Sequence, residues 1–224
     1  MVFRHENGQR NLKSDVLAKA MEFTYVGLNA NQISTRRRIA IRWLFPPPTW
    51  SKLNSDGFSI GNLGKAGGGG LIRNDKGEWL KGYARNVGFS TSVAAELWAL
   101  RDGLRLCIAL RLPAVIIELD AKLIVDLLQK TEGNRNCIDA LVSDCKTELG
   151  NIPIVQVNHC YREVNKCADA LARRGALLSQ DFVIFLDLPA EVSLLLSLDL
   201  AFDRVVLFSF NEISFIPKKI ILVP

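Results

Sequence analysis

The stretch Lys52-Leu-Asn-Ser-Asp-Gly57 decides how the chain is interpreted. Its residues alternate between the two faces of a short β-strand, and Asp56 shares its face with Lys52 and Asn54. The strand stops at an acid followed by glycine, and a glycine-rich segment, residues 61–70, comes next. An acid at the carboxyl end of a strand, beside a backbone that a ligand can approach, suits metal or phosphate chemistry. A plain Asp-Gly turn is the alternative interpretation.

The composition narrows the class of protein. The chain has 224 residues, of which 49% are hydrophobic and 23% charged, so a globular core is expected. A net charge of +5 favours a polyanionic partner. The only two histidines, His5 and His159, argue against a histidine-based zinc site or catalytic triad. Five cysteines without a Cys-x-x-Cys pair indicate reduced thiols and an intracellular location, in the nucleus or the cytoplasm.

Three prolines at residues 46–48 mark a predicted domain boundary, because they cannot continue a helix or a central strand. The segment before them contains a predicted helix at residues 14–25 and a basic run at residues 35–43. That run is either an arm that contacts phosphates or a solvated segment beside an edge strand. We therefore predict a leader, residues 1–49; a central domain, residues 50–180; and an apolar C-terminal tail, residues 181–224.

The tail has no clear period after Phe185, so it must cover an apolar face, recruit a partner or promote aggregation. Its most apolar part, residues 192–210, is interrupted by Asp199, Asp203 and Arg204, which excludes a membrane span.

The central domain shows a pattern of three strands, helix, strand, two helices, strand and helix. Its first three strands are sequential and Lys76-Gly77 marks a hairpin, so they predict an antiparallel meander. The later strand–helix alternation predicts parallel neighbours. We therefore expect an α/β fold with a mixed five-stranded sheet and helices on both faces. The predicted elements are strands at 52–56, 69–75, 78–87, 114–120 and 154–159, and helices at 91–112, 122–130, 136–149 and 162–178.

Four acids are expected to converge in this fold. Asp120 ends a dense apolar strand as Asp56 ends the first, and the carboxyl ends of parallel neighbours meet at one sheet edge. Glu96 and Asp169 border the apolar stripes of their helices, where an unpaired carboxylate is costly to bury. Four such groups could hold Mg²⁺, which prefers oxygen ligands.

Each acid also has an ordinary alternative. Glu96 can pair with Arg101 or Arg105, Asp169 can pair with Arg173 one helical turn on, and Asp120 can cap the following helix.

Five sequence blocks together resemble the type 1 ribonuclease H family, most closely the ribonuclease-H-like domains of plant retroelement-related proteins. The resemblance implies cleavage of the RNA strand of RNA–DNA hybrids by two Mg²⁺ ions, with Mn²⁺ as a substitute. It assigns catalytic and metal-binding roles to Asp56, Glu96, Asp120 and Asp169. The blocks are Lys52–Gly57, Gly67–Arg73, Ala95–Leu100, Ile117–Asp120 and Tyr161–Ala172.

The resemblance also implies that Gly57, Ser59 and Asn62 approach the 2′-hydroxyl groups of the RNA. The family's histidine loop before the last helix and its basic protrusion are absent from this sequence. His159 is instead expected to be a core or edge residue. Grip on the substrate must then come from other basic residues, for which the candidates are Lys65, Arg73, Lys81, Arg85 and residues 36–38.

Three hypotheses follow. The chain is a monomeric, Mg²⁺-dependent endonuclease on RNA–DNA hybrids, a catalytically weak nucleic-acid-binding module of the same fold, or a retroelement relic.

Overall fold

The computed structural model describes residues 37–129, 137–201, 204–208 and 220–222, all of which belong to one compact unit, residues 33–224. The predicted leader helix at residues 14–25 lies outside the described residues. Within the described part of the chain, no helix is both long and apolar enough to span a bilayer.

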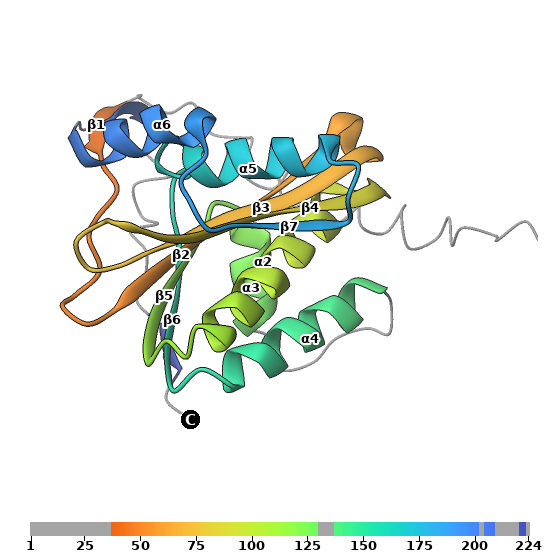
Figure 1. The fold of residues 1–224 in the computed structure, drawn as a ribbon, viewed down its shortest axis with the longest axis horizontal. Helices are drawn as coiled ribbons and strands as arrows, with labels where there is room; N and C mark the ends of the chain where they lie inside the picture. The colour runs from red at the N-terminus through yellow and green to blue at the C-terminus, as the bar shows by residue number, and fades with distance from the viewer. Residues whose placement is uncertain (1–36, 130–136, 202–203, 209–219, 223–224) are drawn as a thin grey trace, which may run out of the picture. The chain divides into compact units, whose positions relative to one another are not determined.

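A mixed sheet forms the centre of the fold (Figure 1). The five predicted strands lie side by side in the order β4-β3-β2-β5-β6, with β2 antiparallel to β3 and parallel to β5. This confirms the meander and the parallel half. Two further strands, β7 and β9, extend the edges. In sheet order the strands are β7 (Phe182–Phe185), β4 (Trp79–Ser90), β3 (Gly64–Arg73), β2 (Ser51–Ser59), β5 (Ala114–Leu119), β6 (Ile154–His159) and β9 (Ile220–Leu222).

A second, two-stranded sheet joins two segments that lie far apart in the sequence. Its strands, β1 (Arg37–Ile41) and β8 (Arg204–Phe208), pair antiparallel. The basic run of the predicted leader is therefore paired with the predicted tail over these residues.

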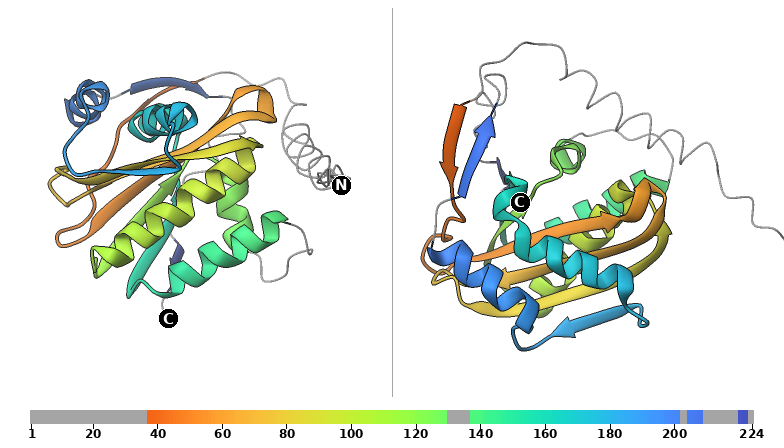
Figure 2. Two further views of the ribbon diagram at one scale, coloured as in Figure 1. Left: turned by 45° about the vertical axis from the view of Figure 1, so that its right-hand side comes forward. Right: turned by 90° about the horizontal axis from the view of Figure 1, so that it is seen from above.

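Helices cover both faces of the large sheet, as predicted (Figures 1 and 2). One face carries α2 (Ser92–Ala109), α3 (Lys122–Gln129) and α4 (Cys137–Gly150). The other carries α5 (Lys166–Leu177) and α6 (Ala190–Ala201). Two short 3-10 turns, η1 (Ile60–Asn62) and η2 (Arg162–Val164), complete these elements.

The helix α2 owes its position to its cap and its apolar stripe. Thr91 precedes the helix, and its Oγ1 accepts a hydrogen bond from the backbone nitrogen of Ala94 at 3.2 Å. Leu97, Leu100 and Leu104 recur at helical spacing and are fully buried against the sheet. The larger of the two hydrophobic clusters that the described residues form lies on this side.

The glycine run of β3 lets α5 pack closely against the opposite face. A Cβ atom on Gly67 would lie 2.1 Å from the backbone nitrogen of Ala176, and one on Gly69 would lie 2.3 Å from that of Ala172. The sequence suggested a backbone open to a ligand here. That expectation is wrong for these glycines, because a helix occupies the space.

The predicted helix at residues 162–178 is divided in two. Asn165, with φ −106° and ψ 14°, separates η2 from α5. The tail supplies α6, whose Val192 and Leu196 pack in a second buried cluster with Leu71 and Leu171. This part of the tail covers an apolar face, which was one of the three roles considered for it.

Candidate active site

Asp56 and Asp120 lie side by side because of strand register. In the parallel pair of β2 and β5, Ser55 is opposite Leu119, so the next residue of each strand is an acid at the same sheet edge. Asp56 is only 2% exposed, and its Oδ1 accepts a hydrogen bond from the backbone nitrogen of Gly57 at 2.9 Å.

Glu96 reaches this edge because α2 approaches β2 unusually closely. A Cβ atom on residue 57 would lie 2.1 Å from the Glu96 backbone nitrogen, so only glycine permits the contact. Glu96 is buried in the first half of α2 and lies at the same edge of the sheet as the two aspartates.

The three carboxylates form one cluster. One oxygen each of Asp56, Glu96 and Asp120 lies within 4.8 Å of the other two. Burial and then the charge of Asp120 raise the pKa of Asp56 well above its usual value. Burial and then the charge of Asp56 raise the pKa of Glu96. Close, desolvated carboxylates favour a shared proton or a bound cation.

Glu96 provides a further sign that the cluster could accept a cation. Its Oε2 is buried without a hydrogen-bond partner among the described residues. Such an atom is unusual in a folded protein, since buried polar atoms are nearly always paired. The arrangement therefore suits a hard cation with oxygen ligands.

Asp169 stands apart from the other three acids. Both of its oxygens accept hydrogen bonds from Nε of Arg173, at 3.1 and 3.0 Å, so the alternative i,i+4 pairing is present. Asp169 does not belong to the cluster of three. It is close enough that its charge contributes to the raised pKa of Asp56.

Two residues contact Asp120 in a way that the sequence analysis did not predict. Asn165 Nδ2 donates to Asp120 Oδ1 at 3.0 Å, and Arg162 Nε donates to Asp120 Oδ2 at 3.4 Å. The Arg162 side chain is 73% exposed, so its guanidinium faces solvent at the acid cluster. Both residues lie in the turn before α5. The signal for this turn in the sequence was an asparagine directly ahead of an alanine-rich helix.

His159 also lies beside the cluster. It is half-buried at the end of β6, as expected for an edge residue, and its Nε2 lies 3.2 Å from the backbone oxygen of Asp120. Burial lowers its pKa from the ordinary histidine value, so the neutral form is favoured.

The residues that are expected to contact the RNA lie next to the acid cluster. Gly57 and Ser59 follow Asp56 on β2, and the Ser59 hydroxyl donates to the backbone oxygen of Ser90 at 2.8 Å. Asn62 ends η1, and its side chain lies outside the described residues.

Two basic residues considered for substrate grip are occupied inside the protein. Arg73 is 0% exposed and pairs with Asp199 at 3.1 Å. Arg85 pairs with Asp102. Arg73 is therefore unavailable to a phosphate, and that expectation is wrong. Lys65 is exposed and Lys81 is half-buried, so both stay candidates for contact with the substrate.

Comparison with known sequences gives two findings. The profile of a family described as reverse transcriptase-like matches residues 54–175. A candidate ribonuclease H protein of Arabidopsis thaliana is 36% identical over 159 residues, which make up 71% of this chain and 26% of that protein. The chain thus spans about a quarter of the length of this curated relative.

Three solved structures are similar in fold. Ribonuclease H1 of the archaeon Halobacterium salinarum has a TM-score of 0.53 at 22% identity, over 56% of this chain and 96% of that one. The N-terminal ribonuclease H domain of a Mycobacterium tuberculosis protein has a TM-score of 0.54 at 23% identity, over 57% and 93%. A ribonuclease H1 named LC11, solved in complex with an RNA/DNA hybrid, has a TM-score of 0.52 at 25% identity, over 56% and 96%.

Proposed function

The chain belongs to the reverse-transcriptase-like family of ribonuclease-H-like domains, and from this membership we propose that it is a divalent-metal-dependent endonuclease that cleaves the RNA strand of RNA–DNA hybrids. The observation that carries the proposal is the meeting of Asp56, Glu96 and Asp120 within 4.8 Å. The hybrid-bound ribonuclease H1 named LC11 supports the choice of substrate.

The residues present fit a hard cation. Three carboxylates from a strand, a helix and a strand end supply oxygen atoms, and the unpaired Oε2 of Glu96 offers a free acceptor. The raised pKa values of Asp56 and Glu96 reflect burial first and then the negative charges of the neighbouring acids. Mg²⁺ binds such oxygen sets while keeping several waters, and Mn²⁺ can replace it.

Asp56, Glu96 and Asp120 would hold the metal, and Asp169 would complete a second site after release from Arg173. When bound, a pair of such ions activates a water and stabilises the leaving oxygen in phosphodiester cleavage. The protein's own contribution is a rigid, largely buried frame in which β2, β5 and α2 fix the three side chains before substrate arrives.

Ser59 would recognise ribose. Its hydroxyl hydrogen is directed to Ser90, which leaves its oxygen lone pairs able to accept from a 2′-hydroxyl group. Gly57, on the same strand, would line the same approach, and we propose Asn62 as a further contact to the RNA from the family resemblance alone. Arg162 offers an exposed cation beside Asp120 for the substrate or product phosphate.

A cleavage assay tests the proposal. A labelled RNA–DNA hybrid is incubated with the full chain in Mg²⁺ or Mn²⁺, beside Asp56→Asn and the exposed control Asp187→Asn. We expect cleavage of the RNA strand by the parent and the control, and loss of cleavage with retained hybrid binding in Asp56→Asn. Equal cleavage by Asp56→Asn would contradict the proposal.

A catalytically weak nucleic-acid-binding module is the second candidate. The pairing of both Asp169 oxygens with Arg173 favours it, because a ligand of the second ion is then engaged elsewhere. Hybrid binding by the parent without cleavage in either metal would select this function over the nuclease.

A further inference from the structure

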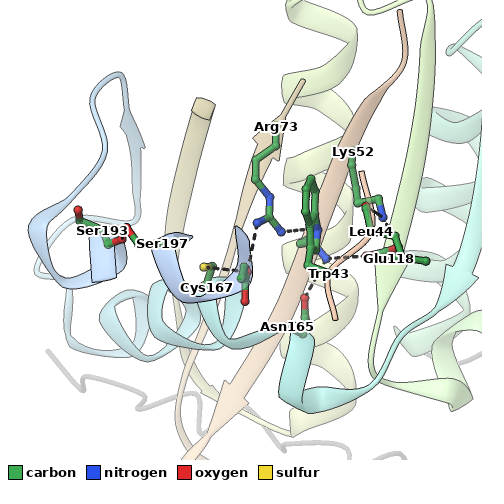
Figure 3. A network of polar contacts seen from close by, with 11 residues as sticks. Trp43, Leu44, Lys52, Arg73, Glu118, Asn165, Cys167, Ser193 and Ser197 are labelled. Carbon is green, nitrogen blue, oxygen red and sulfur yellow. Dashed lines mark hydrogen bonds and ion pairs between the residues drawn. The ribbon is translucent and has the colours of Figure 1, made fainter. Parts of the chain in front are cut away.

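A buried polar network joins the two flanks of the family-matched region to its centre (Figure 3). Trp43 precedes that region and Asp199, in α6, follows it, yet both are buried, at 2% and 4% exposed. They converge on Arg73 of β3. Its Cζ lies 3.6 Å from the centroid of the Trp43 ring, and its Nη1 donates to Asp199 Oδ2 at 3.1 Å.

Trp43 and Arg73 both donate to one oxygen. Trp43 Nε1 lies 3.0 Å from Asn54 Oδ1, and Arg73 Nη2 lies 2.7 Å from the same atom. An indole nitrogen and a guanidinium can only donate, so Asn54 must present its oxygen to them. The amide nitrogen of Asn54 is thereby turned toward Glu118 and Asn165.

The orientation of Asn54 fixes that of Asn165. Asn54 Nδ2 donates to Glu118 Oε2 at 3.1 Å and to Asn165 Oδ1 at 3.3 Å. Asn165 then points its own Nδ2 at two acceptors, the backbone oxygen of Ser55 and Oδ1 of Asp120, each at 3.0 Å.

This network has a direction. Donor-only groups stand at one end and a carboxylate at the other, so both amides can adopt only one orientation. If Asn54 turned over, its oxygen would face Oδ1 of Asn165. Asn165 would then either keep two oxygens in contact or turn its own oxygen toward Ser55 and the Asp120 carboxylate. Two acceptors in contact repel, and Asp120 would lose its aligned donor.

We infer that Trp43 and Asp199 are positioning residues of the acid cluster, which act through Arg73 and the two asparagines to orient Asp120 for metal binding. The inference rests on the proposed function, because it assigns Asp120 as a ligand. It makes the segments outside residues 54–175 part of the working site. The relay parallels the outer groups that hold metal ligands in place in other proteins.

Replacing Arg73 or Asp199 alone would not test this role, because the other residue would be left as an unpaired buried charge that destabilises the fold. The charges of Arg73 and Asp199 are therefore removed together, in the triple variant Trp43→Phe/Arg73→Met/Asp199→Leu. The apolar replacements fill similar volumes, and the phenylalanine ring keeps the packing of Trp43. Asn54 loses both donors, while the cluster acids Asp56, Glu96 and Asp120 are untouched.

The measurements are Mn²⁺ binding by titration calorimetry, thermal unfolding and hybrid cleavage by the full chain. We expect the Mn²⁺ affinity of the triple variant to fall about ten- to a hundred-fold at a similar Tm. Its kcat should fall with little change in KM, since hybrid contacts are intact. Glu191→Gln is the matched control, because it breaks the exposed α5–α6 ion pair with Arg174 and leaves the network intact.

Unchanged Mn²⁺ affinity in a folded triple variant would overturn the positioning role and leave the proposed nuclease standing. A parent chain that takes up no Mn²⁺ would overturn both. If the triple variant does not fold, Trp43→Phe alone carries the test. It retains the ring beside Arg73 and loses one donor to Asn54, so a smaller loss of Mn²⁺ affinity is expected and none would overturn the role.

Discussion

The backbone of Glu96 lies so close to Gly57 that a side chain on residue 57 would overlap it. An added Cβ atom would come within 2.1 Å of the Glu96 nitrogen and 2.6 Å of its Cα. Because these are helix backbone atoms, α2 would have to move. We predict that Gly57→Ala destabilises the fold by about 1–3 kcal/mol, a typical cost of overpacking. Thermal and denaturant unfolding measure this.

The same substitution should also weaken Mn²⁺ binding, since moving α2 separates Glu96 from Asp56. Gly150→Ala is the control, because a Cβ atom there would meet nothing within 4 Å. A Gly57→Ala variant with the stability and metal affinity of the parent would show that α2 tolerates displacement at this point.

The raised pKa values of Asp56 and Glu96 predict how metal-free stability depends on pH. Below the unfolded pKa values, about 4, both groups are protonated in both states and the fold has its full stability. As the pH rises through the raised folded values, the unfolded chain releases its protons more readily and this stability is lost. We expect Tm in EDTA to fall from pH 4 upward through that range.

The contribution of the pair is isolated by the double variant Asp56→Asn/Glu96→Gln, which removes both titrations. Its metal-free Tm should fall less over the same pH range, and it should exceed that of the parent at pH values above the raised pKa values. Saturating Mg²⁺ should stabilise the parent there and leave the variant unchanged. Parallel Tm profiles for the two proteins in EDTA would contradict the prediction.

Asp169 should matter less to the first metal ion than the three clustered acids do. It lies outside the cluster and pairs with Arg173. We therefore predict that Asp120→Asn removes most Mn²⁺ binding, whereas Asp169→Asn lowers only a weaker second uptake. Titration calorimetry distinguishes one site from two. Equal losses in the two variants would place Asp169 in the primary site.

The sequence predicted those parts of the fold and site that depend on local pattern. Strand alternation and helical period located the five central strands and the helices α2, α3, α4 and α5. They did not predict α6, because the tail has no clear period. The juxtaposition of Asp56 and Asp120 was predicted from two acids that each end a strand. The two acids do lie side by side, but β2 continues to Ser59, and only its parallel pairing with β5 stops before Asp56. Glu96 was placed correctly at the sheet-facing edge of its helix.

The features that the sequence did not predict depend on contacts between distant segments. Arg73 was considered a surface residue, yet Asp199, 126 positions later, pairs with it in the interior. No periodic pattern in the sequence of β3 indicates that a residue of α6 pairs with Arg73. The backbone of the β3 glycines was expected to be open to a ligand, and only the fold shows that α5 fills the space beside Gly67 and Gly69.

The packing of α5 gives the last prediction. Leu171 is fully buried in the cluster that also holds Leu71, Val192 and Leu196, so its side chain joins β3, α5 and α6. Leu171→Ala should cost about 2–5 kcal/mol of unfolding free energy, because it removes buried methyl groups and leaves a cavity. Leu177→Ala, in the same helix at 77% exposed, should change stability by less than about 0.5 kcal/mol. Denaturant unfolding measures both. Similar values for the two variants would mean that α6 does not pack on α5 in solution, and the burial of Asp199 against Arg73 would then be lost as well.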